Sequence, residues 1–369
     1  MKAVVLRRIG FPWVMDVEDI PRPSPRRREV LIRVVGSGVC HSDLHVALGE
    51  IPFPLPAVLG HEVSGIIEEV GPDVEGLSKG DAVVTSFIVP CGECYYCRRG
   101  REELCEKFHS TLRRGVYFDG NTRFRTRDGA PIYTYLLGGW AEYTVVPATD
   151  VFKAPQSLYD KLWKLAPVGC AVMTAYGACR NAGLMPDEFV AVYGIGGVGT
   201  NIVQIASKVF NARVIAIDIK DEKLEFAQKL GAEFIINSSR VNPVDEIMKI
   251  TNGRGADVAV EAIGLPATQI QAIKSVRAGG RAVMVGLSKA GAEAPYEINS
   301  LVRREVMIIG SYGGRPSQDI PVILDLIAKN IINIDMIITN IYSRLEDANE
   351  ALEELHHGKI LGRAVIKLP

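Results

Sequence analysis

The chain has 369 residues, of which 47% are hydrophobic, enough for two domains with sizeable cores. Its 42 basic and 43 acidic residues give a formal net charge of -1, which argues against a nucleic acid or an acidic membrane as partner and favours a small molecule. The first ten residues carry charges and lack the pattern of a secretory signal, so we expect a cytoplasmic protein. Scarce glutamine and frequent Ile, Val, Glu and Arg hint at a thermophile.

The first part of the chain, to about residue 155, reads as short strands separated by glycine and proline. Few long helical periods occur there. The segment 110–137 is charged and contains glycine, so we expect a long surface excursion. The expected strands are residues 2–6, 29–36, 63–70, 82–88 and 141–147.

Four of the seven cysteines form one local group, Cys91, Cys94, Cys97 and Cys105, with the spacing C-x2-C-x2-C-x7-C. Tetrahedral zinc is the commonest explanation of such a group. Two disulfides in an oxidising compartment, or in a hyperthermophile, would be an alternative. A zinc ribbon that binds nucleic acid or protein is another, although the neutral charge weighs against it.

After residue 165 the pattern changes to apolar runs bounded by glycine and separated by amphipathic stretches. Such alternation predicts βαβ units and a parallel sheet. The tail, residues 319–369, shows two helical patterns and a final strand at 364–368. The strands expected in the middle are residues 189–193, 213–217, 234–237, 257–262, 281–285 and 306–310.

A glycine motif follows the first of these strands and opens a helical pattern. It reads G-x-G-x-x-G, and the next strand ends at Asp218. The glycines allow a tight turn and a close approach of a pyrophosphate, and the acid can accept both ribose hydroxyls of NAD while repelling the phosphate of NADP. The uncharged stretch 189–207 is long enough for a membrane helix, but its glycines fit the dinucleotide motif better. The motif residues are Gly194, Gly196, Gly197, Val198 and Gly199.

Three further residues could form a second metal site: Cys40, His61 and Cys170. A catalytic zinc usually has three protein ligands and one open position. Taken singly, a buried free cysteine and an ordinary histidine explain them as well. Spacing alone does not show that the three converge.

The motifs together resemble a known family. The run from Gly60-His61-Glu62 through Gly65, Gly71 and Val74 is similar to the zinc signature of the medium-chain dehydrogenase/reductase family. The run 40–45, the cysteine group, Cys170 with Thr174 and Gly177, the glycine motif and Asp218 follow in family order. From end to end the chain resembles the zinc-dependent alcohol dehydrogenases of that family.

This resemblance implies an α/β fold with two domains. A GroES-like, β-rich catalytic domain would comprise residues 1–171 and 313–369, and a Rossmann domain that binds NAD would comprise residues 172–312. Two zinc ions per chain are implied. The four-cysteine group would hold a structural zinc, whereas Cys40, His61 and Cys170 would bind the catalytic zinc.

The same resemblance assigns supporting roles. Glu62 would be a transient or alternative zinc ligand, and Asp43 would orient His61. Ser42 would take the alcohol proton and pass it through the cofactor ribose to His45. Further cofactor contacts are implied for His41 near the pyrophosphate, Thr174 near the nicotinamide, Lys223 near the adenosine ribose and Arg363 near a phosphate.

For the substrate, the family implies a pocket lined by Ile51, Phe87, Trp140 and Leu287. Serine at position 42 leaves more room than threonine, so we expect bulky, aromatic or secondary alcohols. Polyol and formaldehyde-type dehydrogenases are the nearest rivals; Cys170 argues against the first, and Ile51, where the glutathione-dependent branch has an acid, against the second. Zinc-free quinone reductases lack the Cys40 and His61 pair. Members are dimers or tetramers, so residues 302–312 are expected to pair across a two-fold axis.

Overall fold

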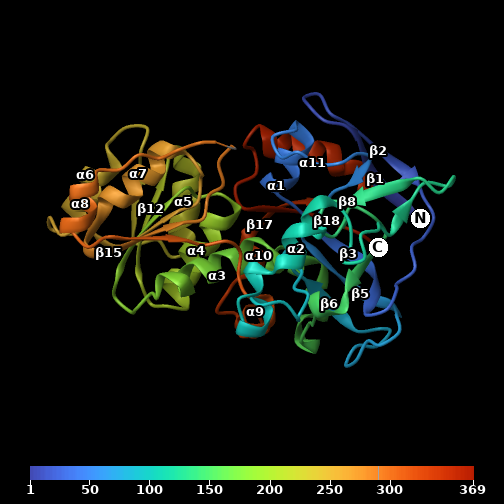
Figure 1. Ribbon diagram of the computed structural model, residues 1–369. Helices are drawn as coiled ribbons and strands as arrows, with labels where there is room; N and C mark the ends of the chain where they lie inside the picture. Colours follow the sequence, from blue (N-terminus) through green and yellow to red (C-terminus); the bar gives the residue numbers. More distant parts are fainter. Residues whose placement is uncertain (290) are drawn as a thin grey trace. The chain divides into compact units, whose positions relative to one another are not determined.

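The structure, a computed structural model, describes residues 1–289 and 291–369. In it the chain forms two compact units (Figure 1). The first unit comprises Met1–Cys170, Arg315–Ala328 and Ile338–Pro369. The second comprises Ala171–Gly314 and Lys329–Ile337. Within the described residues, no helix combines the length and apolar character needed to cross a bilayer.

The first unit is built on two mostly antiparallel sheets. One has the order β2-β1-β4-β8-β7, and the other has the order β10-β6-β5-β3-β18-β17, with β9 also paired to β3. The long strand β3 is buried along most of its length, as expected for a strand with neighbours on both sides. The strands are β1 Lys2–Arg8, β2 Val14–Asp19, β3 Glu29–Val39, β4 Ala57–Val58, β5 Val63–Val70, β6 Ala82–Thr85, β7 Phe124–Arg125, β8 Pro131–Thr134, β9 Tyr143–Pro147, β10 Val151–Lys153, β17 Ile338–Tyr342 and β18 Arg363–Lys367.

Helical segments of the first unit connect its strands along the chain, and most of them are short. They include α1, whose first residue directly follows Cys40, and the long 3-10 segment η5, which ends at the residue before Cys170. Both cysteines are therefore placed at the junction of a helix with another element. The helical segments are α1 His41–Leu48, η1 Cys97–Arg99, η2 Glu102–Leu104, α2 Glu106–Ser110, η3 Leu112–Arg114, η4 Ala148–Asp150, η5 Gln156–Gly169, α9 Pro316–Ala328, η6 Leu345–Asp347 and α11 Ala348–His356.

Strand β6 is shorter than the sequence predicts. We expect a strand over 82–88, but the ladder ends at Thr85. The next backbone N–H groups have other partners, because Ser86 N donates to the Asp150 carboxyl group and Phe87 N donates to the Gly169 carbonyl. The residues that follow β6 are thereby held beside Gly169, which directly precedes Cys170.

The excursion at 110–137 is also more ordered than expected. It contains β7 and β8, an antiparallel pair, and β8 adds to the sheet through β4. Its buried ion pair joins Arg123 to Glu29, and Tyr117 lies against the Arg123 guanidinium. The charges in this segment are therefore partly internal, which periodicity alone does not reveal.

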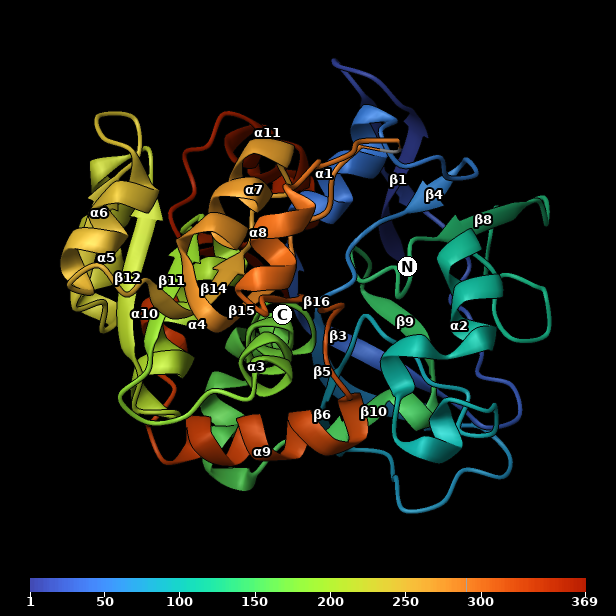
Figure 2. The ribbon, with the colours of Figure 1, turned by 60° about the vertical axis from the view of Figure 1, so that its left-hand side comes forward.

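The second unit is a parallel sheet of six strands in the order β13-β12-β11-β14-β15-β16, with helices along it (Figure 2). Helix α4 packs against both α3 and α5, and α6 packs against α7. Every described pairing in this sheet is parallel, as the buried apolar strands predict. The elements are α3 Ala171–Ala182, β11 Phe189–Tyr193, α4 Gly197–Lys208, β12 Arg213–Asp218, α5 Asp221–Leu230, β13 Phe234–Asn237, α6 Pro243–Ile250, β14 Ala256–Glu261, α7 Pro266–Ser275, β15 Val276–Met284, α8 Ile298–Arg303, β16 Met307–Gly310 and α10 Ile334–Ile337.

Candidate metal centres and coenzyme site

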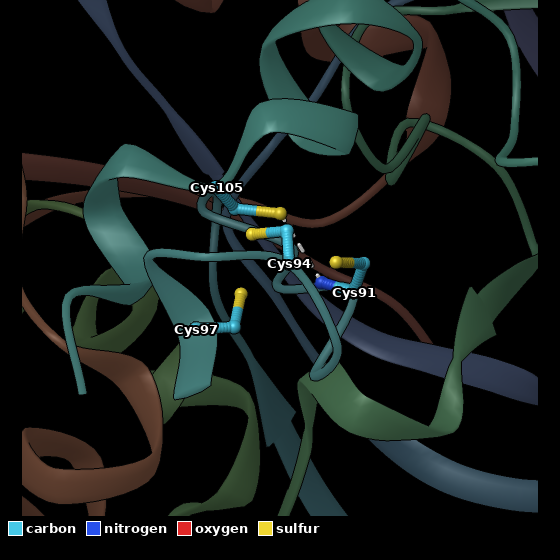
Figure 3. A group of neighbouring side chains, drawn as sticks. All are labelled: Cys91, Cys94, Cys97 and Cys105. Atoms are coloured by element: carbon cyan, nitrogen blue, oxygen red, sulfur yellow. Dashed lines mark hydrogen bonds between the residues drawn. The ribbon is translucent and has the colours of Figure 1, made fainter. Parts of the chain in front are cut away.

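The four clustered cysteines turn their sulfur atoms toward one another (Figure 3). All four sulfur atoms lie within 4.8 Å of one another. All seven cysteines of the chain are free thiols, so the structure contains none of the disulfides considered as an alternative. Four thiolates at this separation suit tetrahedral zinc, whose Zn–S distance is about 2.3 Å.

Backbone groups support this cluster. Cys91 N lies 3.3 Å from Cys105 Sγ and Phe108 N lies 3.5 Å from it, so both donate to the sulfur. Burial raises the pKa of Cys94, but hydrogen bonds from the backbone of Cys97 and Glu106 outweigh this effect and lower it to about 7. The donor set is complete at four sulfurs, which is the composition of a closed structural site.

A second cluster brings together residues that are far apart in the sequence: Cys40, His61, Glu62 and Cys170. Their ligand atoms lie within 4.8 Å of one another, and all four residues are buried. Cys40 precedes α1, His61 and Glu62 precede β5, and Cys170 follows η5. Two sulfurs and an imidazole suit zinc and leave its fourth position for Glu62 or another ligand.

The His61 ring is held by a buried carboxylate. Asp43 Oδ1 lies 3.1 Å from His61 Nδ1 and also accepts from Gly60 N at 3.0 Å. Its other oxygen accepts from Cys40 N at 3.3 Å. Because Nδ1 is engaged by Asp43, Nε2 is the ring atom available to a metal. Asp43 therefore fixes two of the ligand residues at once.

Arg363 lies in this cluster, in contacts that the sequence does not predict, while its expected contact with a phosphate stays a prediction. Its side chain is 3% exposed, and Nη2 lies 2.6 Å from Glu62 Oε1 and 3.4 Å from Cys40 Sγ. A buried group of thiols and a carboxylate needs a cation, and the guanidinium on β18 supplies it. Glu62 Oε2 is buried without a hydrogen-bond partner, and a metal ion would satisfy such an oxygen.

The cluster is strongly polarised. Hydrogen bonding to Cys170 and the charges of Arg363 and His61 hold the pKa of Cys40 well below its ordinary value. Burial lowers the pKa of His61, but the negative charges of Asp43 and Cys40 raise it well above its ordinary value. Burial raises the pKa of Glu62 to about 7. Zinc binds its cysteine ligands as thiolates and its histidine ligand as a neutral imidazole, so zinc binding at this site would be coupled to proton release.

The glycine motif of the second unit lies between β11 and α4. Gly194 has a φ of +90°, and a Cβ there would meet Ile263 Cγ1 at 2.4 Å. A Cβ on Gly199 would meet the Gly194 carbonyl oxygen at 1.8 Å, whereas one on Gly196 would have open space around it. The fold therefore requires glycine at positions 194 and 199, whereas Gly196 leaves room for a ligand at the N-terminus of α4.

Asp218 lies at the end of β12, beside this turn. Its Oδ2 accepts from Ile195 N at 2.8 Å, and its Oδ1 accepts from Ile219 N at 2.8 Å. The carboxylate is only partly buried and keeps further acceptor positions. These residues fit a dinucleotide with its pyrophosphate at the helix N-terminus and a ribose at the acid.

Comparisons with known proteins show the family to which the chain belongs. Residues 26–156 match the model of the alcohol dehydrogenase GroES-like domain, and residues 197–329 match that of the zinc-binding dehydrogenases. An NAD-dependent alcohol dehydrogenase of Sulfurisphaera tokodaii is 36% identical, with 99% of each chain covered. The chain belongs to the zinc-dependent alcohol dehydrogenases of the medium-chain dehydrogenase/reductase family.

Two further relatives differ in the substrates that their names give. An S-(hydroxymethyl)glutathione dehydrogenase of Escherichia coli is 33% identical over 99% of both chains. The crystal structure of benzyl alcohol dehydrogenase from Acinetobacter calcoaceticus is 31% identical, covers 100% of this chain and 99% of that one, and superposes with a TM-score of 0.91. The predicted family and fold class, GroES-like with a Rossmann sheet, are confirmed.

The remaining predicted residues of this dehydrogenase lie in several places. Ser42 and His45 are on α1, and Ser42 Oγ lies 3.9 Å from Cys40 Sγ. His41 is exposed on the same helix. Thr174 is 7% exposed on α3, and Lys223 is half-buried on α5.

The predicted substrate pocket is only partly supported. The Phe87 ring lies 6.2 Å from the His61 ring, next to the metal cluster. Trp140, however, is fully buried, and its indole N–H donates to the Gly38 carbonyl, so it belongs to the core and offers no surface to a substrate. Ile51 is half-buried in the first unit, and Leu287 is exposed in the second.

Sequence reasoning missed one neighbour of the cluster, Tyr135, and one neighbour of His45, Glu50. The Tyr135 ring lies 5.7 Å from the His61 ring in an edge-to-face arrangement, and it comes from the segment after β8. The Glu50 carboxylate contacts His45. No motif marks either residue, because both contacts depend on turns whose course only the structure shows.

Proposed function

We propose that this dehydrogenase transfers a hydride reversibly between an alcohol and NAD. The observation that carries the proposal is the convergence of Cys40, His61 and Cys170 in one buried cluster, with Asp43 on the histidine. The glycine turn beside Asp218 supports NAD as the hydride acceptor. A zinc ion held there would acidify a bound alcohol, as zinc lowers the pKa of water from 15.7 to about 7.

The residues around the metal would then have separate tasks. Cys40, His61 and Cys170 bind it, Asp43 keeps the His61 ring in the tautomer that leaves Nε2 free, and Glu62 serves as an alternative ligand. Ser42 would take the alcohol proton and pass it through the cofactor ribose to His45, and its position near Cys40 Sγ supports this role. His45 would deliver the proton to solvent, which its 39% exposed side chain on the same helix supports.

For the substrate we propose bulky, aromatic or secondary alcohols. The small Ser42 and the apolar ring of Phe87 beside His61 support this choice, as does the likeness to benzyl alcohol dehydrogenase. The likeness to S-(hydroxymethyl)glutathione dehydrogenase makes a formaldehyde-type activity the second candidate. Ile51 argues against the formaldehyde-type activity, because an apolar side chain at this position offers no charge to a glutathione adduct.

A steady-state panel tests this proposal. We expect NAD-dependent oxidation with the highest kcat/KM for benzyl or secondary alcohols, weak activity with NADP, and two zinc ions per chain. The Cys40→Ala variant should lose the activity and one zinc. A kcat/KM highest for ethanol, or for formaldehyde with glutathione, would contradict the substrate assignment.

We also propose that the chain forms a homodimer, or a homotetramer built from such dimers. Among the described strands, β16 lies at the end of the sheet and pairs with β15. Met307 and Ile308 on this strand are 49% and 39% exposed, and Val302 nearby is 65% exposed. An apolar edge strand of this kind is a site for pairing with a second copy. Light scattering that gives the mass of a single chain would refute it.

A further inference from the structure

His45 has a carboxylate partner whose place is fixed by the end of helix α1. The helix ends at Gly49, whose φ is 80°, and the backbone N–H of Glu50 donates to the His45 carbonyl at 2.9 Å. This is the Schellman arrangement, in which the residue after the glycine folds back onto the last turn. The Glu50 carboxylate thereby reaches Nδ1 of the His45 ring.

The contact decides which ring nitrogen of His45 can accept a proton. A carboxylate only accepts hydrogen bonds, so in the neutral ring the proton lies on Nδ1 and the lone pair lies on Nε2. Once Nε2 gains a proton, the imidazolium faces a negative charge. A carboxylate behind the histidine of a serine and histidine pair acts in this way in hydrolases.

We propose that Glu50 is a positioning residue of the proton relay and acts through His45. The inference rests on the proposed function, in which Ser42 and His45 remove the alcohol proton. His45 takes that proton at Nε2, becomes the imidazolium while Glu50 accepts from Nδ1–H, and then releases the proton from Nε2 to water.

If His45 and Glu50 formed only an ordinary surface ion pair, removing the pair would not change turnover. The His45 and Glu50 side chains are 39% and 51% exposed, and ion pairs at such exposure contribute little to stability. Glu346, which pairs with Lys2 and is 43% exposed, provides a matched control because its partner is a lysine outside the site. A relay role predicts that only the first pair affects turnover.

The test compares Glu50→Gln, His45→Gln, the double variant and Glu346→Gln in the zinc-loaded enzyme. We expect Glu50→Gln to lower kcat for alcohol oxidation by about 10-fold, with the zinc content and the Kd of NADH unchanged. Glu346→Gln should leave kcat unchanged. In the His45→Gln background, the Glu50 substitution should have no further effect, since it acts through that ring.

A spectroscopic reading is independent of turnover. In wild type, 15N NMR of the histidines, assigned with His45→Gln, should show the Nδ1–H tautomer for His45, and Glu50→Gln should shift it toward Nε2–H. Equal kcat values for the two glutamate variants, additive effects in the double variant, or an unchanged tautomer would overturn the relay role. If the wild type oxidises no alcohol, the proposed function fails and the relay fails with it; an active wild type with a fully active Glu50→Gln variant overturns the relay alone.

Discussion

The two metal clusters of this dehydrogenase are built in opposite ways. The four-cysteine cluster takes all its ligands from residues 91–105, and two of its cysteines are only partly buried. The cluster of Cys40, His61 and Cys170 takes its ligands from three distant segments, and each ligand is buried. The first cluster needs only a short loop, whereas the second requires the strands and helices of the whole first unit to be in place.

The surroundings differ as well. The four-cysteine cluster has backbone N–H donors on its sulfurs and a complete set of four thiolates. The buried cluster has a carboxylate on its histidine, a guanidinium on its glutamate and one carboxylate oxygen without a partner. A closed site stabilises a lobe, while a site with a spare ligand and a charged shell can exchange ligands during a reaction.

Removing a ligand from the buried cluster should have the largest effect on activity. We expect Cys170→Ala to lose one zinc and about 10⁴-fold in kcat/KM, equivalent to about 5 kcal/mol. Cys179→Ala is the matched control, because Cys179 is a fully buried thiol outside both clusters. Metal analysis and initial rates check both variants, and an inactive Cys179→Ala with two zinc ions would show that the comparison measures packing instead.

Removing a ligand from the four-cysteine cluster should act on stability. Cys94→Ser is expected to lose the other zinc and to destabilise the fold by about 4 kcal/mol, or roughly 5 °C in Tm for a chain of 369 residues. The folded fraction should keep its kcat. Calorimetry with Glu93→Gln as control separates the metal from the loop, since Glu93 is exposed and pairs with Lys107. Loss of kcat at unchanged Tm would reverse the roles assigned to the two clusters.

The charged shell of the buried cluster should make a smaller contribution. Arg363→Gln leaves Glu62 without its cation, and we expect a loss of about 3 kcal/mol in the free energy of unfolding. The double variant Arg363→Gln with Glu62→Gln should recover part of this loss, because no charge remains unpaired. Denaturant unfolding measures both. Arg344→Gln, an exposed partner of Asp347, should be neutral.

Sequence reasoning reached the two sites to different degrees. The spacing of Cys91 to Cys105 predicts its cluster directly, because neighbouring residues in a short loop cannot lie far apart. Cys40, His61 and Cys170 carry no such signal, and only their resemblance to a family joined them. The glycine motif and Asp218 were predicted from residues alone, since turn, strand and acid follow in one continuous segment.

The failures have physical causes. Trp140 was expected to line the substrate pocket, yet the structure buries it in the core, and it brings Arg363 against Glu62, a contact that no motif indicates. A single sequence shows the type of a side chain but not which neighbours the sheet brings to it. Strand β6 was predicted too long for a related reason, because Ser86 leaves the ladder to bind Asp150, a residue 64 positions away.

Asp150 binds Ser86, and the next residue, Phe87, donates to the Gly169 carbonyl beside Cys170, so substituting Asp150 tests whether the two clusters are coupled. Ser86 Oγ lies 2.6 Å from the Ile88 carbonyl and 2.8 Å from Asp150 Oδ1. Ser86 has one hydroxyl proton, and if the carbonyl receives it, Asp150 must supply its own. Burial raises the pKa of Asp150 well above its ordinary value.

The pH dependence of stability then has a definite sign. The folded state holds the Asp150 proton more tightly than the unfolded chain, whose pKa is about 3.9, so this group's contribution is full below that pH and is lost as pH rises through the folded pKa. Asp150→Asn cannot ionise. Its unfolding free energy relative to wild type should therefore increase with pH and level off above the folded-state pKa of Asp150. Denaturant unfolding from pH 4 to 8 measures this difference in unfolding free energy. A difference that does not change with pH would show that ionisation of Asp150 has no effect on stability. A lost zinc in the variant would show that the 86–90 segment couples the two clusters.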